Sequence, residues 1–186
     1  MKSNRLEAFT DGVIAIVLTI MVLEMKVPGE GAVMGLIRLT PFLLAYGVSF
    51  ATIAVFWVNH HRLLQARHDI DSRTLWSNLF LLFWLTLIPF TVRWLTESHF
   101  GTAATATFGI VLGLAAVGYH LTERAVVACN PTAPRAGFRG RLSIFLYAIA
   151  VPLSLVSRPI AVAIYVAVIG IWLLPDRTFW GAAEAR

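Results

Sequence analysis

The side chains best able to do chemistry in this sequence are polar groups that lie beside or inside long apolar runs. Asp11 falls in the first turns of one such run, and the residues Asn-His-His-Arg at positions 59–62 end another. Ionisable groups are costly to place in a bilayer and indicate function by default. His60 and His61 are adjacent, so they point about 100° apart on a helix, and one metal ion cannot easily bind both.

Motifs for other chemistry are missing from the sequence. It contains no HExxH, GxSxG or GxxxxGK[ST] segment, and its one cysteine, Cys129, has no partner at metal-ligand spacing. A haem held by two histidines would need His120 to face His60 or His61. We favour the interpretation that the histidines belong to a polar network that positions the helices. We therefore expect no enzymatic activity and no cofactor.

The composition requires that these side chains be positioned by helices in a membrane. Of the 186 residues, 58% are hydrophobic and 13% are charged, against roughly 45–50% and 25% in soluble domains. Mean hydropathy is +0.76. The net charge is +5, but lysines and arginines are scattered singly between apolar runs, which argues against a nucleic-acid-binding face. We expect a single all-α membrane domain over residues 1–186.

Six segments are apolar enough for helices that cross or enter a bilayer about 30 Å thick. The last two are short because Pro159 interrupts one long apolar stretch. Asp11 within the first segment, and the lack of a cleavage site after it, argue against a signal peptide. Gly109 and Gly113 form a GxxxG motif for close helix packing, within one chain or between chains. The six expected spans are residues 6–25, 39–64, 75–95, 102–121, 142–157 and 160–174.

Charge asymmetry predicts the orientation. With six spans, eleven of the 15 lysines and arginines lie on the side that holds both termini. Because positive loops stay in the cytoplasm, both termini are expected to be cytoplasmic and the protein to be a multi-pass protein of the cytoplasmic membrane.

This topology brings several polar residues to one depth. Arg5 and Asp11 begin the first span, while Trp57 and the histidine pair end the second on the same side; Asn78 and Glu123 fall in the same layer. Asp11 is either a cap for the free N–H groups of its helix or part of a polar network with a histidine and an arginine.

Ile16, Thr19, Ile20 and Leu23 form one stripe along the first span, at i, i+3, i+4 and i+7. Such a stripe is usually a packing seam. Hydrophobic constrictions in channels, which gate by dewetting, are built from the same kind of residue around a symmetry axis. The spacing alone leaves both interpretations open.

Three segments resemble the transmembrane protein 175 family, whose animal relative is an endolysosomal potassium channel. RLEAFTDGV matches the family pattern Arg-x-x-x-Phe-Ser-Asp, with Thr10 in place of the serine. FWVNHH resembles the end of the family's second helix, and NLFLLFWLTLIPF is similar to its third. The three occur in order, and the likeness extends over nearly the whole chain.

The resemblance implies a homotetramer in which four first helices line a pore for monovalent cations. It places Ile16, Thr19 and Leu23 on the pore, with constrictions at the two apolar residues and potassium as the permeant ion. It further implies a motif network below the pore, made of Arg5, Phe9, Thr10, Asp11, Trp57, His60 and His61. We expect a passive potassium-permeable channel in the lipid bilayer; the alternative is a small proton-coupled secondary transporter, although internal repeats are not evident.

Overall fold

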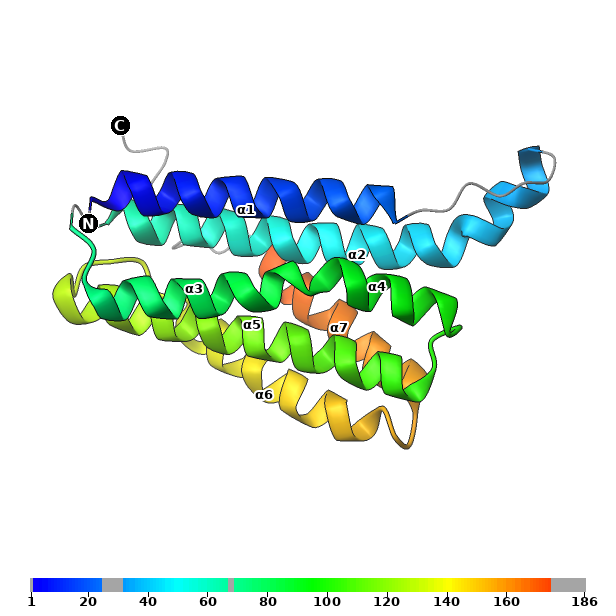
Figure 1. The fold of residues 1–186 in the computed structure, drawn as a ribbon. Coiled ribbons are helices and arrows are strands. Elements are labelled where there is room, and N and C mark those ends of the chain that lie inside the picture. Colours follow the sequence, from blue (N-terminus) through cyan, green and yellow to red (C-terminus); the bar gives the residue numbers. More distant parts are fainter. Residues whose placement is uncertain (1, 25–31, 67–68, 175–186) are drawn as a thin grey trace.

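The computed structural model describes residues 2–24, 32–66 and 69–174. These residues are helical apart from short connections and one isolated bridge between Lys2 and Asp69. Figure 1 shows the helices as one elongated bundle. The helices are α1 (Ser3–Leu23), α2 (Ala32–Gln65), α3 (Ser72–Thr86), α4 (Ile88–Glu97), α5 (Thr102–Cys129), α6 (Gly137–Leu153) and α7 (Arg158–Leu173).

α3 and α4 together form one membrane span, which the sequence predicted as a single helix over 75–95. The run from Ser72 to Glu97 is long and apolar enough to cross a bilayer as a whole. It breaks at Leu87 because Pro89 has no N–H and cannot continue the hydrogen-bond ladder. The Leu87 N–H instead bonds to the Trp84 carbonyl at 3.2 Å, three residues back. The two helices run on in nearly the same direction (Figure 1).

With α3 and α4 counted as one, the described residues contain six helical segments, the number that the sequence predicts, but their lengths differ from the expected ones. Four of them are long enough to cross a membrane, namely α1, Leu39–Gln65 of α2, the combined α3 and α4, and α5. α2 extends further toward its N-terminus than expected, to Ala32, and contains Pro41. α6 and α7 are shorter and form a hairpin whose turn lies at residues 154–157, slightly before the predicted break.

α5 is the central helix of the bundle and packs against α3, α4, α6 and α7. Its close approach to α3 depends on Gly118, because a Cβ there would lie 2.8 Å from Leu81 Cα. The two glycines of the GxxxG motif contact Tyr165 and Tyr147 of the same chain. The motif therefore serves packing within the subunit, one of the two alternatives left open by the sequence.

The described chain starts at one end of the bundle, and α7 runs back toward that end (Figure 1). Ser3 Oγ donates to the Leu64 carbonyl at 3.0 Å, which ties the start of α1 to the end of α2. Arg139 Nη1 donates to the Leu174 carbonyl at 3.0 Å and ties the start of α6 to the end of α7. Asn130 Nδ2 bonds to the Ala66 carbonyl at 2.6 Å and joins the two regions.

Candidate pore face and polar layer

α1 lies at the edge of the bundle and buries only one stripe of its surface. It contacts α2, α3 and α4. Only 28% of the most apolar 18-residue stretch of α1 is buried, against 56% of the corresponding stretch of α5. Figure 1 shows α1 along one side of the molecule, with α2 beside it. The side chains of the buried stripe are Ser3, Leu6, Thr10, Ile14, Val17 and Met21.

The opposite face of α1 is open and carries the stripe singled out in the sequence. Ile16 is 59% exposed and Leu23 is 81% exposed, and Thr19 lies exposed between them. The Thr19 hydroxyl donates to the Ile16 carbonyl at 2.9 Å, so its proton is held against its own helix. The lone pairs of this oxygen can then accept a hydrogen bond or coordinate a cation.

Asp11 lies near the Trp57 side chain of α2, at the depth expected from the topology. Trp57 Nε1 donates to Asp11 Oδ1 at 2.8 Å. The Trp57 ring stacks on the His61 ring with centroids 6.0 Å apart. His61 Nδ1 in turn pairs with the Glu7 carboxylate, and its Nε2 contacts Gln65. This outer part of the polar layer follows the surface of α1 and α2.

His60 points into the bundle, away from His61. Its Nε2 is 2.6 Å from Asn78 Oδ1 of α3, and Asn78 Nδ2 donates to Thr10 Oγ1 of α1 at 3.0 Å. At most 1% of each of these three side chains is exposed. Because buried polar groups are stabilised only when paired, this chain of hydrogen bonds holds α1, α2 and α3 in one register.

Two of the expected network residues lie apart from these contacts. The Arg5 side chain is exposed, and Phe9 is 53% exposed. Glu123 also lies elsewhere, because its Oε1 accepts from the Ala136 N–H at 2.9 Å and fixes the start of α6. Glu7, which was not singled out from the sequence, joins the layer instead. Its position four residues before Asp11, on the same helix face, was the available signal.

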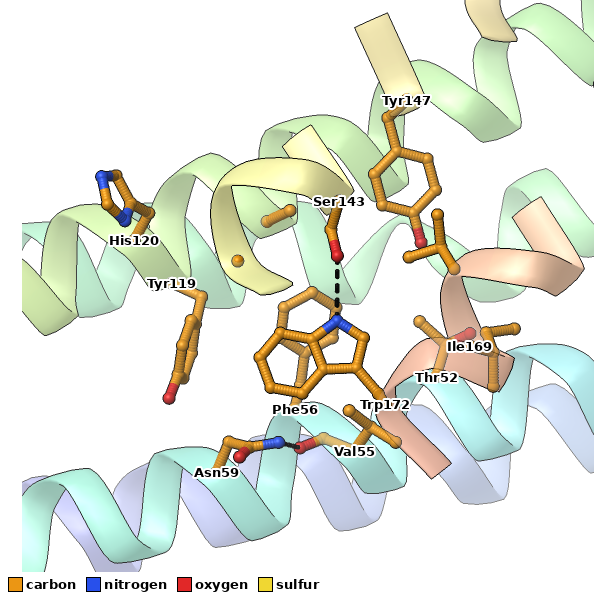
Figure 2. A pocket seen from close by; sticks show the side chains of 13 residues that line it. Thr52, Val55, Phe56, Asn59, Tyr119, His120, Ser143, Tyr147, Ile169 and Trp172 are labelled. Carbon is orange, nitrogen blue, oxygen red and sulfur yellow. Dashed lines mark hydrogen bonds between the residues drawn. The ribbon is translucent and has the colours of Figure 1, made fainter. Parts of the chain in front are cut away.

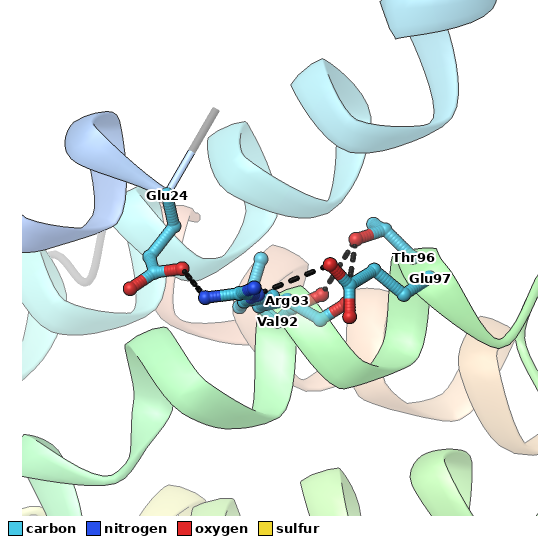
Figure 3. Close-up of polar contacts among 5 residues, drawn as sticks. All are labelled: Glu24, Val92, Arg93, Thr96 and Glu97. Atoms are coloured by element: carbon cyan, nitrogen blue, oxygen red, sulfur yellow. Dashed lines mark hydrogen bonds and ion pairs between the residues drawn. The ribbon is translucent and has the colours of Figure 1, made fainter. Parts of the chain in front are cut away.

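The other end of α1 is attached to α4 by an arginine. Arg93 Nη1 donates to Glu24 Oε2 at 2.8 Å, and Arg93 Nε donates to Glu97 Oε1 at 3.1 Å. Figure 3 shows the Arg93 side chain between the two glutamates, one at the end of α1 and one on its own helix. Glu24 directly follows Leu23, so this ion pair lies next to the end of the exposed stripe.

The histidines are engaged in a way that does not favour a haem site. His60 contacts Asn78, His61 contacts Glu7, and His120 Nδ1 lies 3.7 Å from Glu123 Oε2 on its own helix. Within residues 2–24, 32–66 and 69–174, no group of three or more His, Cys, Asp or Glu side chains is arranged to hold a metal ion.

Comparison with known proteins finds similarity to proteins that are named potassium channels. Residues 5–89 match the family model described as endosomal/lysosomal potassium channel TMEM175. A protein named as a potassium channel from Chryseobacterium sp. (strain P1-3) is 39% identical over 183 residues, covering 95% of each chain. A protein of the same description from Streptomyces collinus is 31% identical over 179 residues, covering 87% of each.

More distant and structural relatives extend the comparison. The crystal structure of a lysosomal potassium-selective channel TMEM175 homolog from Chamaesiphon minutus superimposes with a TM-score of 0.83 at 30% identity, covering 91% of this chain and 95% of that one. A human protein named endosomal/lysosomal proton channel TMEM175 is 35% identical over 96 residues, which is 45% of this chain and 19% of the human one.

Proposed function

Because this chain belongs to the TMEM175 family, we propose that it is a passive potassium-permeable channel of the cytoplasmic membrane. Four copies surround a central pore, and α1 of each copy lines it. Both termini lie in the cytoplasm, on the side where most lysines and arginines gather. Relatives that match almost the full length of this chain carry the name potassium channel, which supports the permeant ion.

The observation that carries the proposal is the open face of α1. A membrane helix at the edge of a bundle faces either lipid or another protein surface, and a lone polar side chain on such a face is unfavourable in lipid. Thr19 is exposed between two apolar residues, and its oxygen can still accept after donating its proton to the Ile16 carbonyl. A pore lined by four copies would supply both water and cations to that oxygen.

Spacing along α1 explains how such a pore would work. Ile16 and Leu23 are seven residues apart, which places them about 10 Å apart along the axis. Each forms an apolar ring that stays closed by dewetting when narrow, while the ring of Thr19 hydroxyls between them replaces part of the hydration shell of the ion. Ions are then selected in the short segment of the pore between these two rings, without a filter of backbone carbonyl groups.

The polar layer keeps α1 in the rotation that this pore needs. The buried hydrogen bonds of Thr10, Asn78 and His60 hold one face of α1 against α2 and α3, and Trp57 holds Asp11 beside it. The stripe on the opposite face is thereby directed away from the subunit. Arg5 and Phe9 lie exposed near the same end, and we assign them to contacts between subunits.

The test is potassium flux in liposomes, measured for the wild type and for Ile16→Ala and Leu23→Ala. Each substitution removes bulk from a constriction, so conductance should rise several-fold and the preference for potassium over sodium should fall. Ile110→Ala provides the control, because Ile110 is exposed at 42% on α5 and lies outside the proposed pore. Unchanged currents in both α1 variants would contradict the pore assignment.

Proton permeation is the second candidate, because the human relative is named a proton channel. The same liposomes, loaded with a pH-sensitive dye, distinguish the two ions: a potassium channel carries potassium current without a matching proton current. Saturable potassium uptake that depends on a proton gradient would instead favour the secondary transporter.

A further inference from the structure

A cleft on the side of α2 that faces α6 and α7 is lined by apolar side chains along most of its length and by arginines at one end, which we call its mouth. It lies between α2, the start of α6 and the end of α7 and has a volume of about 350 Å³. Arg62, Arg135 and Arg139 line it toward the end of the bundle where α1 begins and α2 ends. None of the lining residues that the structure describes is acidic; the carboxylate of Glu123 bonds to the backbone of Ala136 at the edge of this lining.

The α2 wall of the cleft changes character along the membrane normal. Its lining residues on α2 fall on one helix face, beginning at Phe50 and ending at Arg62, and the wall is apolar up to Val58. This distance is roughly 18 Å along the helix, comparable with half the thickness of a hydrocarbon core of about 30 Å. A groove that is apolar toward the middle of the bilayer and cationic at its surface matches the chemistry of an anionic phospholipid.

Asn59 lies next to the arginines in the lining of the cleft and carries a buried polar atom that bears on what binds there. It lines this cleft and also an inner cavity of about 40 Å³, which has room for little more than water-sized groups. Figure 2 shows its amide nitrogen turned toward the Val55 carbonyl, to which it donates at 2.7 Å. Its Oδ1 is buried and has no donor among the described residues. Buried acceptors are normally paired, so this atom indicates that a water or another donor enters the space beside Asn59.

We propose that this cleft binds one anionic phospholipid of the leaflet nearest the start of α1, with its phosphate between Arg62 and Arg135 and one acyl chain along α2 from Val58 to Phe50. Phosphatidylglycerol fits best, because its phosphate is negative and its headgroup, unlike that of phosphatidylcholine, carries no positive charge that would be repelled by the arginines. The inference uses the membrane placement of the helices and is independent of which ion the protein conducts.

The experiment is native mass spectrometry of the detergent-solubilised protein with equal amounts of phosphatidylglycerol and phosphatidylcholine of the same acyl chains. Phosphatidylglycerol should be retained preferentially. Arg62→Gln and Arg135→Gln should each weaken its retention about fivefold, since a basic residue near a lipid phosphate is worth about that factor. Arg139 is left intact because it also holds the Leu174 carbonyl.

Arg141→Gln is the matched control, because Arg141 is exposed on α6, is absent from the described lining and changes the net charge equally. Ala54→Trp fills the apolar part of the cleft and should reduce lipid retention while the arginines remain. Millimolar inorganic phosphate should not displace the lipid. Equal retention of the two lipids, an equal loss in Arg141→Gln, or displacement by free phosphate would overturn the proposal.

Discussion

At the scale of single residues, Thr10 shows what a hydroxyl contributes at this position. Its Oγ1 accepts from Asn78 Nδ2, and Asn78 in turn contacts His60, so one hydroxyl completes a fully buried chain across three helices. The pattern to which this sequence is similar has serine here. Threonine supplies the same oxygen, and its additional methyl group lies in the buried stripe of α1.

We therefore predict that Thr10→Val destabilises the protein while Thr10→Ser is tolerated. Valine has the shape of threonine but leaves the Asn78 amide unpaired. We expect a loss of about 1 kcal/mol, between the average of an interhelical hydrogen bond in a membrane and the cost of an unsatisfied buried group. Thermal unfolding of the solubilised protein measures it. Equal melting temperatures for the two variants would show that the hydrogen bond contributes nothing.

The sequence predicted the depth of the polar residues but not their partners. Connectivity and charge asymmetry place Asp11 and Trp57 at one level, and the structure pairs them. Which way each histidine points depends on the rotation of α2 about its axis, which no local pattern in 59–62 specifies. Glu7 was missed because a glutamate in the first turns of a helix also fits a favourable interaction with the helix dipole.

At the scale of helices, the number of apolar segments was predictable and their irregularities were only partly so. Hydropathy and length predict six segments, and Pro159 indicated the hairpin of α6 and α7. Pro89 was visible in the sequence, yet the break at Leu87 lies inside an uninterrupted apolar run that reads as one span. The contact of Gly118 with Leu81 depends on a partner on another helix, so it cannot be read from either segment alone.

The attachment of α1 to α4 leads to a prediction at this scale. Arg93 has one partner on α1, Glu24, and one on its own helix, Glu97. Glu24→Gln removes the charge that joins the two helices, whereas Glu97→Gln removes the charge that pairs with Arg93 within α4. Exposed ion pairs are worth little for stability, so neither variant should melt much lower. The effect should appear as greater mobility of the α1 end.

A spin label at Val22→Cys in a Cys129→Ser background measures this mobility. Val22 is 43% exposed beside the stripe, and Cys129 is the only native cysteine. Glu24→Gln should broaden the distribution of label distances between subunits, and Glu97→Gln should leave it close to the parent. Identical distributions in all three proteins would mean that packing alone positions this end of α1.

At the scale of the whole molecule, the proposed pore needs more than one subunit. One helix with an open face encloses nothing, and the bundle behind α1 is closed by packing around α5. Closed cyclic symmetry brings the same face of each copy to a common axis, because residues related by rotation must meet around it. The hypothesis of a channel thus depends on assembly, a property that neither the composition nor the subunit geometry specifies.

Thr19→Cys in the Cys129→Ser background tests this arrangement directly. If four copies of α1 surround one axis, four thiols lie close together at the level of the hydroxyl ring, and soft thiolate ligands bind Cd²⁺ tightly. Micromolar Cd²⁺ should then block potassium flux into liposomes, and a chelator should restore it. Ile110→Cys, on the exposed surface of α5, should conduct normally with or without the metal, because its thiols are far from the path and from one another. Flux through the Thr19→Cys protein that persists in saturating Cd²⁺ would place α1 away from the permeation path, and the exposed stripe would then be a surface that packs against lipid or a neighbouring subunit.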